Sequence, residues 1–135
     1  MEETKRVSVS VITPSCSGEY LAKTINALWQ GTQLPFEHLF ILDNPGKACL
    51  DTVLRLYTQN ANPERKVKIM INPFLLGASG AYNLGLSLAK GDYLTLLSDD
   101  LSVPPGFLDK CLGTLLRNPN FGWVSCQHDH GYPVP

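Results

Sequence analysis

Two adjacent carboxylates stand shortly after a very apolar run of the chain. The run Tyr93 to Leu97 is followed by Ser98, Asp99 and Asp100. Two neighbouring negative charges repel each other by about 1 kcal/mol at 4 Å in water, and by several-fold more near a protein surface. A bound cation removes that repulsion, and oxygen donors of this kind suit Mg²⁺ or Mn²⁺. The segment is a candidate divalent-metal site, and the alternative is a solvated acidic loop.

A divalent ion at this place would favour a phosphate ligand. Mg²⁺ is usually held by one or two carboxylates together with substrate phosphates. Negatively charged phosphates approach two aspartates only where a metal bridges them. A nucleoside diphosphate is therefore a natural ligand for Asp99 and Asp100.

Polar residues also follow two other apolar runs. Thr13, Pro14 and Ser15 end the first run, and Asp43 with Asn44 ends the second. In an open parallel sheet, ligands lie beyond the carboxyl ends of the strands. Asp43 begins an Asp-Asn-Pro-Gly sequence, which is equally typical of an Asx turn or a helix cap. Both interpretations of Asp43 stay open.

A tract of small residues runs from Gly77 through Gly80 and Asn83 to Gly85. At a helix start, such residues allow close backbone approach, and the free amides attract anions. The alternative is close packing of the helix on the sheet. The tract is neither GxGxxG nor a P-loop. A dinucleotide fingerprint would follow the first strand, where Thr13 to Cys16 stands instead, so a nicotinamide oxidoreductase is disfavoured.

Five short apolar runs alternate with segments of helical periodicity, which predicts alternating strands and helices. Apolar strands joined by crossover helices indicate a doubly wound α/β fold, with a mainly parallel sheet and helices on both faces. The predicted strands are Val7 to Thr13, His38 to Leu42, Val67 to Ile71, Tyr93 to Leu97 and Gly122 to Cys126.

Length and composition favour one folded domain without nucleic-acid or membrane partners. The chain has 135 residues, 44% of them apolar, and a net charge of −1. These values exclude disorder and give no field that attracts nucleic acid or an anionic membrane. We expect neither a signal peptide nor an integral membrane segment. The four cysteines form no CxxC pair, so we expect reduced thiols and a cytoplasmic location.

Several residues that could do chemistry are better interpreted as structural. We expect His38 to be structural and Trp29 to pack in the core. Arg65 flanks the third strand, and we expect a solvated side chain there. His128 and His130 lie in a polar terminal segment, where a solvated loop is favoured over a metal cluster.

Together these motifs resemble the family-2 nucleotide-sugar glycosyltransferases, which have the GT-A fold, and the resemblance covers most of the chain. Ser98, Asp99 and Asp100 look like a variant of the family's D-x-D motif, and Tyr82 stands where an arginine is usual. The matching segments are Val7 to Pro14, Ile41 to Asn44, Gly77 to Gly85 and Lys90 to Asp100.

The resemblance implies a role for each motif. Asp43 would bond the base, Asp99 would hold the ribose, and Asp100 would ligate Mn²⁺ or Mg²⁺ on the diphosphate. The residues implied to bind the nucleotide sugar are Thr13, Pro14, Ser15, Asp43, Gly77, Gly80, Asn83, Ser98 and Asp99.

The resemblance also implies an activity. We expect residues 1–135 to form a single domain that binds a nucleotide-diphosphate sugar, as the N-terminal part of a longer glycosyltransferase. Such an enzyme transfers the sugar with inversion to an acceptor hydroxyl, here unknown. The resemblance places the general base beyond Pro135, so we expect donor binding without efficient transfer by this chain alone.

Two alternatives remain at this point. One is a degenerate nucleotide-binding or interaction domain without turnover. The other is a receiver-like phosphoacceptor domain, which needs paired acids after the first strand and a lysine after the fifth. This sequence has Thr13 to Ser15 and Gln127-His128 at those places, so the second alternative is disfavoured.

Overall fold

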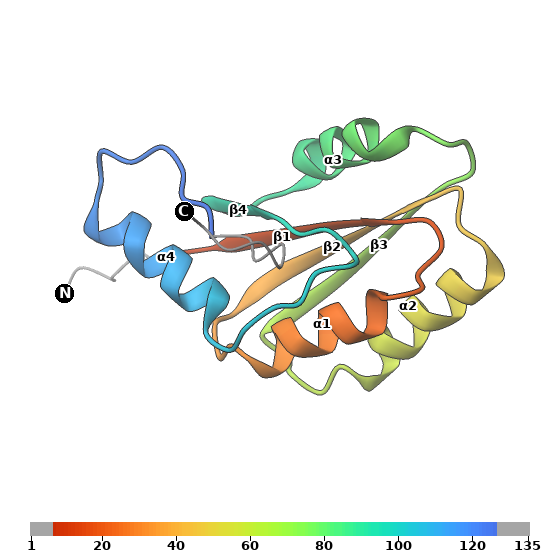
Figure 1. Ribbon diagram of the computed structural model, residues 1–135, viewed down its shortest axis with the longest axis horizontal. Helices are drawn as coiled ribbons and strands as arrows, with labels where there is room; N and C mark the ends of the chain where they lie inside the picture. Colours follow the sequence, from red (N-terminus) through yellow and green to blue (C-terminus); the bar gives the residue numbers. More distant parts are fainter. Residues whose placement is uncertain (1–6, 127–135) are drawn as a thin grey trace, which may run out of the picture.

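The computed structural model describes residues 7–126. Four strands within this range form a parallel sheet. The strand order is β3-β2-β1-β4, so β1 lies between β2 and β4 (Figure 1). The two central strands, β1 and β2, are almost wholly buried, as expected for strands that are covered on both faces. The strands are β1 (Val9–Ser15), β2 (Phe36–Asp43), β3 (Arg65–Asn72) and β4 (Tyr93–Leu96).

Helices cover both faces of the sheet, which confirms the doubly wound α/β prediction (Figure 1). On one face, α1, α2 and α4 lie together, and α3 lies on the other. No helix within residues 7–126 is long and apolar enough to cross a membrane. The helices are α1 (Leu21–Gln30), α2 (Lys47–Gln59), α3 (Gly77–Leu88) and α4 (Phe107–Arg117).

The two faces bury apolar cores of different size. Alternate residues of β1 point to opposite faces, as the pleat of a strand requires. Val11 therefore joins the larger core with α1 and α2, while Ile12 joins a smaller core under α3. The smaller core contains Ile12, Leu39, Ile41 and Ala81.

The prediction of a fifth strand at Gly122 to Cys126 is wrong. These residues form neither a strand nor a helix. Trp123 is 77% exposed and Phe121 is 55% exposed, so the apolar side chains of this segment do not join either core. A strand gains stability from a paired edge and a buried face, and this segment has neither within residues 7–126.

A buried polar cluster lies in the larger core and centres on His38. The Trp29 indole donates to His38 Nδ1 at 2.9 Å, and His38 Nε2 lies 2.8 Å from Thr13 Oγ1. Because the indole can only donate, Nδ1 is the acceptor, and Nε2–H donates to Thr13. The imidazole also stacks on Phe40, with ring centroids 4.3 Å apart. The expected structural roles of His38 and Trp29 are confirmed.

Arg65 contradicts its expected solvated position, because it is only 9% exposed. Its guanidinium lies 4.8 Å from the Trp29 ring and donates to the Trp29 carbonyl at 3.0 Å. A guanidinium is planar and weakly hydrated, so it can stack on a ring while its terminal NH₂ groups donate, here to Asn60 Oδ1 and to the Trp29 carbonyl. The Trp29 ring of α1 therefore stabilises Arg65, the first residue of β3, in a buried position.

We predict that stability falls on mild acidification because of His38. Burial, and then the charge of Arg65, lower the pKa of His38 from 6.5 to about 3. In the unfolded chain, His38 therefore takes up a proton below pH 6.5. In the folded chain, it takes up this proton only near pH 3. Neutral His38 therefore makes its full contribution to the free energy of unfolding above pH 6.5. This contribution is lost as the pH falls toward 3, by up to about 1.4 kcal/mol per pH unit.

Urea unfolding between pH 7.5 and about pH 5 measures this dependence while most carboxylates stay ionised. The His38→Gln variant is the control. It is expected to be less stable at neutral pH, but its stability changes less with pH. Parallel pH profiles for the two proteins would contradict the prediction.

Candidate functional site

The carboxyl ends of β1 and β4 meet where the chain changes sides of the sheet. The chain proceeds from β1 to β2 and β3, then returns through α3 to place β4 on the other side of β1. In doubly wound sheets, such a switch point is where ligands bind. Here Ser15 Oγ of β1 donates to Asp99 Oδ2 at 2.6 Å. The predicted residues Ser15 and Asp99 are therefore brought together.

The acidic loop, residues 97–106, presents the two aspartates differently. Asp99 is half-buried, and Asp100 is exposed. Ser98 Oγ donates to Asp100 Oδ1 at 2.7 Å, so the hydroxyl and the exposed carboxylate lie side by side. This arrangement leaves Asp100 the more accessible of the two carboxylates, as its predicted metal role requires.

Helix α1 and Gly31, which directly follows it, hold the acidic loop at two places. The buried Thr24 hydroxyl lies 2.8 Å from the Leu101 carbonyl and 3.2 Å from the Asp99 carbonyl. At the second place, Gly106 N donates to Gly31 O at 2.9 Å. Thr24 is not among the residues predicted from the sequence. Its signal is a hydroxyl at a position that the helical period of Leu21, Ile25 and Leu28 assigns to the buried face.

Tyr82 of α3 is half-buried and lies close enough to the acidic loop to be affected by its charges. Burial, followed by the negative charges of Asp99 and Asp100, raises the pKa of Tyr82. The phenol therefore stays neutral and keeps its proton as a hydrogen-bond donor. Where an arginine would supply a positive charge, this chain presents a neutral donor.

Asp43 caps helix α3 from the end of β2. Its Oδ1 accepts from Leu76 N at 2.8 Å, and its Oδ2 accepts from Gly77 N at 2.9 Å. These amides belong to the helix N-terminus, where no intrahelical acceptor exists for them. Asp43 therefore does act as a helix cap, but on α3, which is distant in sequence, and not on the helix that follows its own Asp-Asn-Pro-Gly turn. Its contact with a base stays a prediction.

The glycine tract packs closely at one position and turns the chain at another. A Cβ on Gly85 would lie 2.4 Å from Ile12 Cγ2, so only glycine lets α3 approach the sheet this closely. Gly77 has a φ of +77°, which favours glycine as well. Close packing therefore explains Gly85. Ligand contacts of Gly77, half-buried Gly80 and exposed Asn83 stay predictions.

The structure does not bring the side chain of Thr13 to the site. Thr13 is buried and its hydroxyl contacts His38, so only its backbone lies near the carboxyl edge of the sheet. Pro14 is half-buried beside it. Any nucleoside contact at Thr13 would involve backbone atoms, and the predicted pocket role of both residues stays a prediction.

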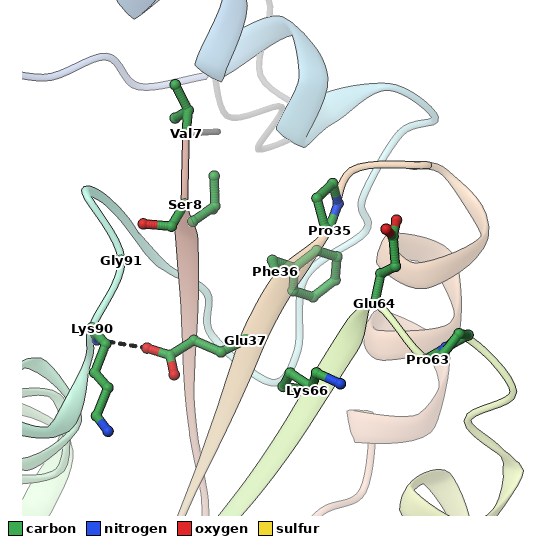
Figure 2. A pocket seen from close by; sticks show the side chains of 11 residues that line it. Val7, Ser8, Pro35, Phe36, Glu37, Pro63, Glu64, Lys66, Lys90 and Gly91 are labelled. Atoms are coloured by element: carbon green, nitrogen blue, oxygen red, sulfur yellow. Dashed lines mark hydrogen bonds between the residues drawn. The ribbon is translucent and has the colours of Figure 1, made fainter. Parts of the chain in front are cut away.

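A cavity of about 440 Å³ lies at the opposite, amino-terminal ends of the strands (Figure 2). Its lining includes Phe36, Glu37, Lys66 and Lys90, and none of the predicted site residues. Lys90 N donates to Glu37 Oε1 across this end of the sheet at 2.6 Å. We place the candidate site by its chemistry at the carboxyl ends, because parallel sheets bind ligands there.

The oxygen donors of the acidic loop fit a divalent ion. Within residues 7–126, no group of three or more His, Cys, Asp or Glu side chains could hold a metal. Mg²⁺ does not need such a group, since it commonly takes one or two carboxylates with phosphate and water. The exposed Asp100 carboxylate and the adjacent Ser98 hydroxyl supply hard oxygen donors.

Sequence comparison identifies the class of protein. The model of glycosyl transferase family 2 matches residues 10–131, so the chain belongs to this family. An uncharacterized glycosyltransferase of Methanocaldococcus jannaschii is 26% identical over 93% of this chain. Another, from Haemophilus influenzae, is 28% identical over 82% of it. The chain spans 43% of the length of each of these relatives.

A solved structure shares the fold. The mannosyltransferase PcManGT of Pyrobaculum calidifontis, in complex with GDP-Man and Mn²⁺, superposes with a TM-score of 0.73 and 17% identity. The match covers 83% of this chain and 33% of that one. The α/β Rossmann-like arrangement is thus that of a GT-A glycosyltransferase, as the sequence predicted. Membership of family 2 also removes the receiver-like alternative.

We predict that Asp43→Ala destabilises the protein by about 1 to 3 kcal/mol, because two helix-terminal amides lose their acceptor. Urea unfolding measures the loss. Asp51→Ala is the matched control, since that exposed carboxylate only pairs with Lys47 on the surface of α2 and should change stability little. Equal effects of the two substitutions would show that the Asp43 cap contributes nothing.

Proposed function

We propose that this chain binds the donor of a family-2 glycosyltransferase, a nucleotide-diphosphate sugar, at the carboxyl ends of β1 and β4. One observation carries the proposal. The Ser15–Asp99 hydrogen bond joins β1 to the acidic loop at the switch point and leaves Asp100 exposed beside it. The similar mannosyltransferase binds GDP-Man and Mn²⁺, which supports this class of ligand.

In this proposal each side chain has a distinct task. Asp99, held by Ser15, binds the ribose, and Asp100 with Ser98 holds Mn²⁺ or Mg²⁺. The ion, when bound, would offset the charge of the diphosphate as it leaves. Tyr82 supplies a neutral donor near the same carboxylates. We propose that the small residues at the start of α3 allow close approach of the ligand.

We also propose how the sugar is transferred to the acceptor. Family-2 membership supports transfer of a hexosyl or related sugar, and we propose inversion at the sugar with attack by an acceptor hydroxyl. Such attack needs a general base. We assign none among residues 7–126, and we propose that these residues form the donor-binding part of a longer enzyme.

We predict that a nucleoside diphosphate raises the melting temperature in a metal-dependent manner. A ligand at 100 times its dissociation constant adds about 2.7 kcal/mol, which corresponds to a rise of roughly 5 to 15 °C for this chain length. Thermal unfolding with UDP, GDP, CDP or dTDP, each with Mn²⁺, Mg²⁺ or a chelator, measures the effect and identifies the base.

Two substitutions at exposed carboxylates sharpen this experiment. Asp100→Asn is expected to abolish the metal-dependent rise, whereas Asp51→Asn on α2 should retain it. A nucleotide effect that survives both the chelator and Asp100→Asn would contradict the metal site. The absence of any nucleotide effect in a cooperatively melting protein would favour the degenerate binding or interaction domain.

A further inference from the structure

The sulfur of Cys111 on α4 lies against the sulfur of Cys126, which belongs to the segment after this helix. Cys111 Sγ and Cys126 Sγ are 3.5 Å apart, although the residues are 15 positions apart in sequence. The other two thiols have different neighbours. Buried Cys49 contacts the Ser15 hydroxyl, and exposed Cys16 contacts the Asn44 carbonyl. Among residues 7–126, Cys111 and Cys126 are therefore the thiols that contact each other.

The setting of this pair allows a covalent bond with a small movement. A disulfide has its sulfurs about 2.05 Å apart, so the two atoms must approach by about 1.5 Å. Cys111 is fixed within α4, but residues 118–126 form neither helix nor strand, and Cys126 is exposed. The loop segment can thus supply the movement while the helix stays in place.

We propose that Cys111 and Cys126 form a thiol–disulfide exchange site for a low-molecular-weight disulfide such as oxidised glutathione. The Cys126 thiolate attacks one sulfur of the disulfide, and the released thiolate takes up a proton. Cys111, after losing its proton to solvent, then attacks Cys126 Sγ and expels the second thiol. Two protein thiols are oxidised to one disulfide, and one external disulfide is reduced to two thiols.

The environment of the two sulfurs explains this order. Cys126 is exposed, whereas Cys111 is half-buried. Burial, and then the hydrogen bond and negative charge of Cys126, raise the pKa of the Cys111 thiol. Cys111 is therefore the poorer first nucleophile. Once Cys126 is in a mixed disulfide, its hydrogen bond and charge no longer oppose ionisation of Cys111.

The consequence is a reversible link between α4 and the segment that follows it. Residues 118–126 carry the exposed side chains of Phe121 and Trp123. The disulfide would close a 15-residue span and restrict the positions of both side chains. This site lies outside the proposed donor site, so it can be tested without a nucleotide.

The test is oxidation of the native chain by oxidised glutathione near neutral pH, followed by acid quenching and peptide mapping without reductant. The expected product is two hydrogens lighter than the reduced chain, has a Cys111–Cys126 link and is restored by dithiothreitol. Cys111→Ser is expected to stop at a stable glutathione adduct on Cys126. Cys16→Ser keeps the pair intact and should form the same link at the same rate.

The proposal makes native proximity responsible for the reaction, so the link should form faster in the folded chain than in denaturant. A link that formed no faster in the folded chain would overturn it. A native product linked through Cys16 or Cys49 would also overturn it, as would a wild-type chain that stops at glutathione adducts on Cys111 and Cys126.

Discussion

The geometry of the candidate site depends on one junction, the contact between the end of β1 and the loop after β4. Leu97 N donates to Ile12 O at 2.9 Å, which continues the pairing of β4 with β1 by one bond. The Ser15–Asp99 hydrogen bond then closes the junction at the side-chain level. Without it, the Asp99 carboxylate would lose its hydrogen bond to β1, although Thr24 and Gly31 would still hold the loop backbone. With it, this carboxylate is held and the next one along the chain is presented to solvent.

Helix α3 makes this junction possible because it returns the chain across the second face of the sheet. Two features fix its position. Gly85 lets the helix backbone approach Ile12 on β1, and Asp43 anchors the helix N-terminus to β2. Since α3 leads directly into β4, the same contacts determine where β4 and the acidic loop lie. The glycine tract thus acts on the site through packing as well as through any ligand contact.

The sequence predicted the features that depend on local pattern. Apolar runs separated by helical periods indicated β1 to β4, and the order of polar residues after the strands indicated Ser15 and Asp99 at one edge. The fifth predicted strand, Gly122 to Cys126, failed because pattern alone does not show whether a neighbouring edge is available. Sheet membership is decided by tertiary pairing, which a short apolar run cannot encode by itself.

Features that depend on a partner distant in sequence could not be predicted from the sequence. Arg65 is buried because the Trp29 ring comes from another element, and charge alone indicated solvent. Thr24 fits the period of an apolar helix face, but its acceptors lie on the acidic loop, 75 and 77 positions away. Asp43 is a further case, because its local sequence indicated a turn or a cap, whereas its carboxylate binds the α3 amides of Leu76 and Gly77, 33 and 34 positions away.

Support and binding are divided between different side chains, which gives each a separate experimental signature. Thr13, His38 and Thr24 are buried and bonded to protein groups, so their substitution acts first on the free energy of unfolding. Asp100 and Asn83 are exposed, and their substitution should leave the fold intact and act on ligand affinity. Asp99 belongs to both groups, because one carboxylate oxygen is bonded to Ser15. A change at Asp99 therefore alters stability and binding together, and Asp100 is the position at which the metal proposal is tested without disturbing the junction.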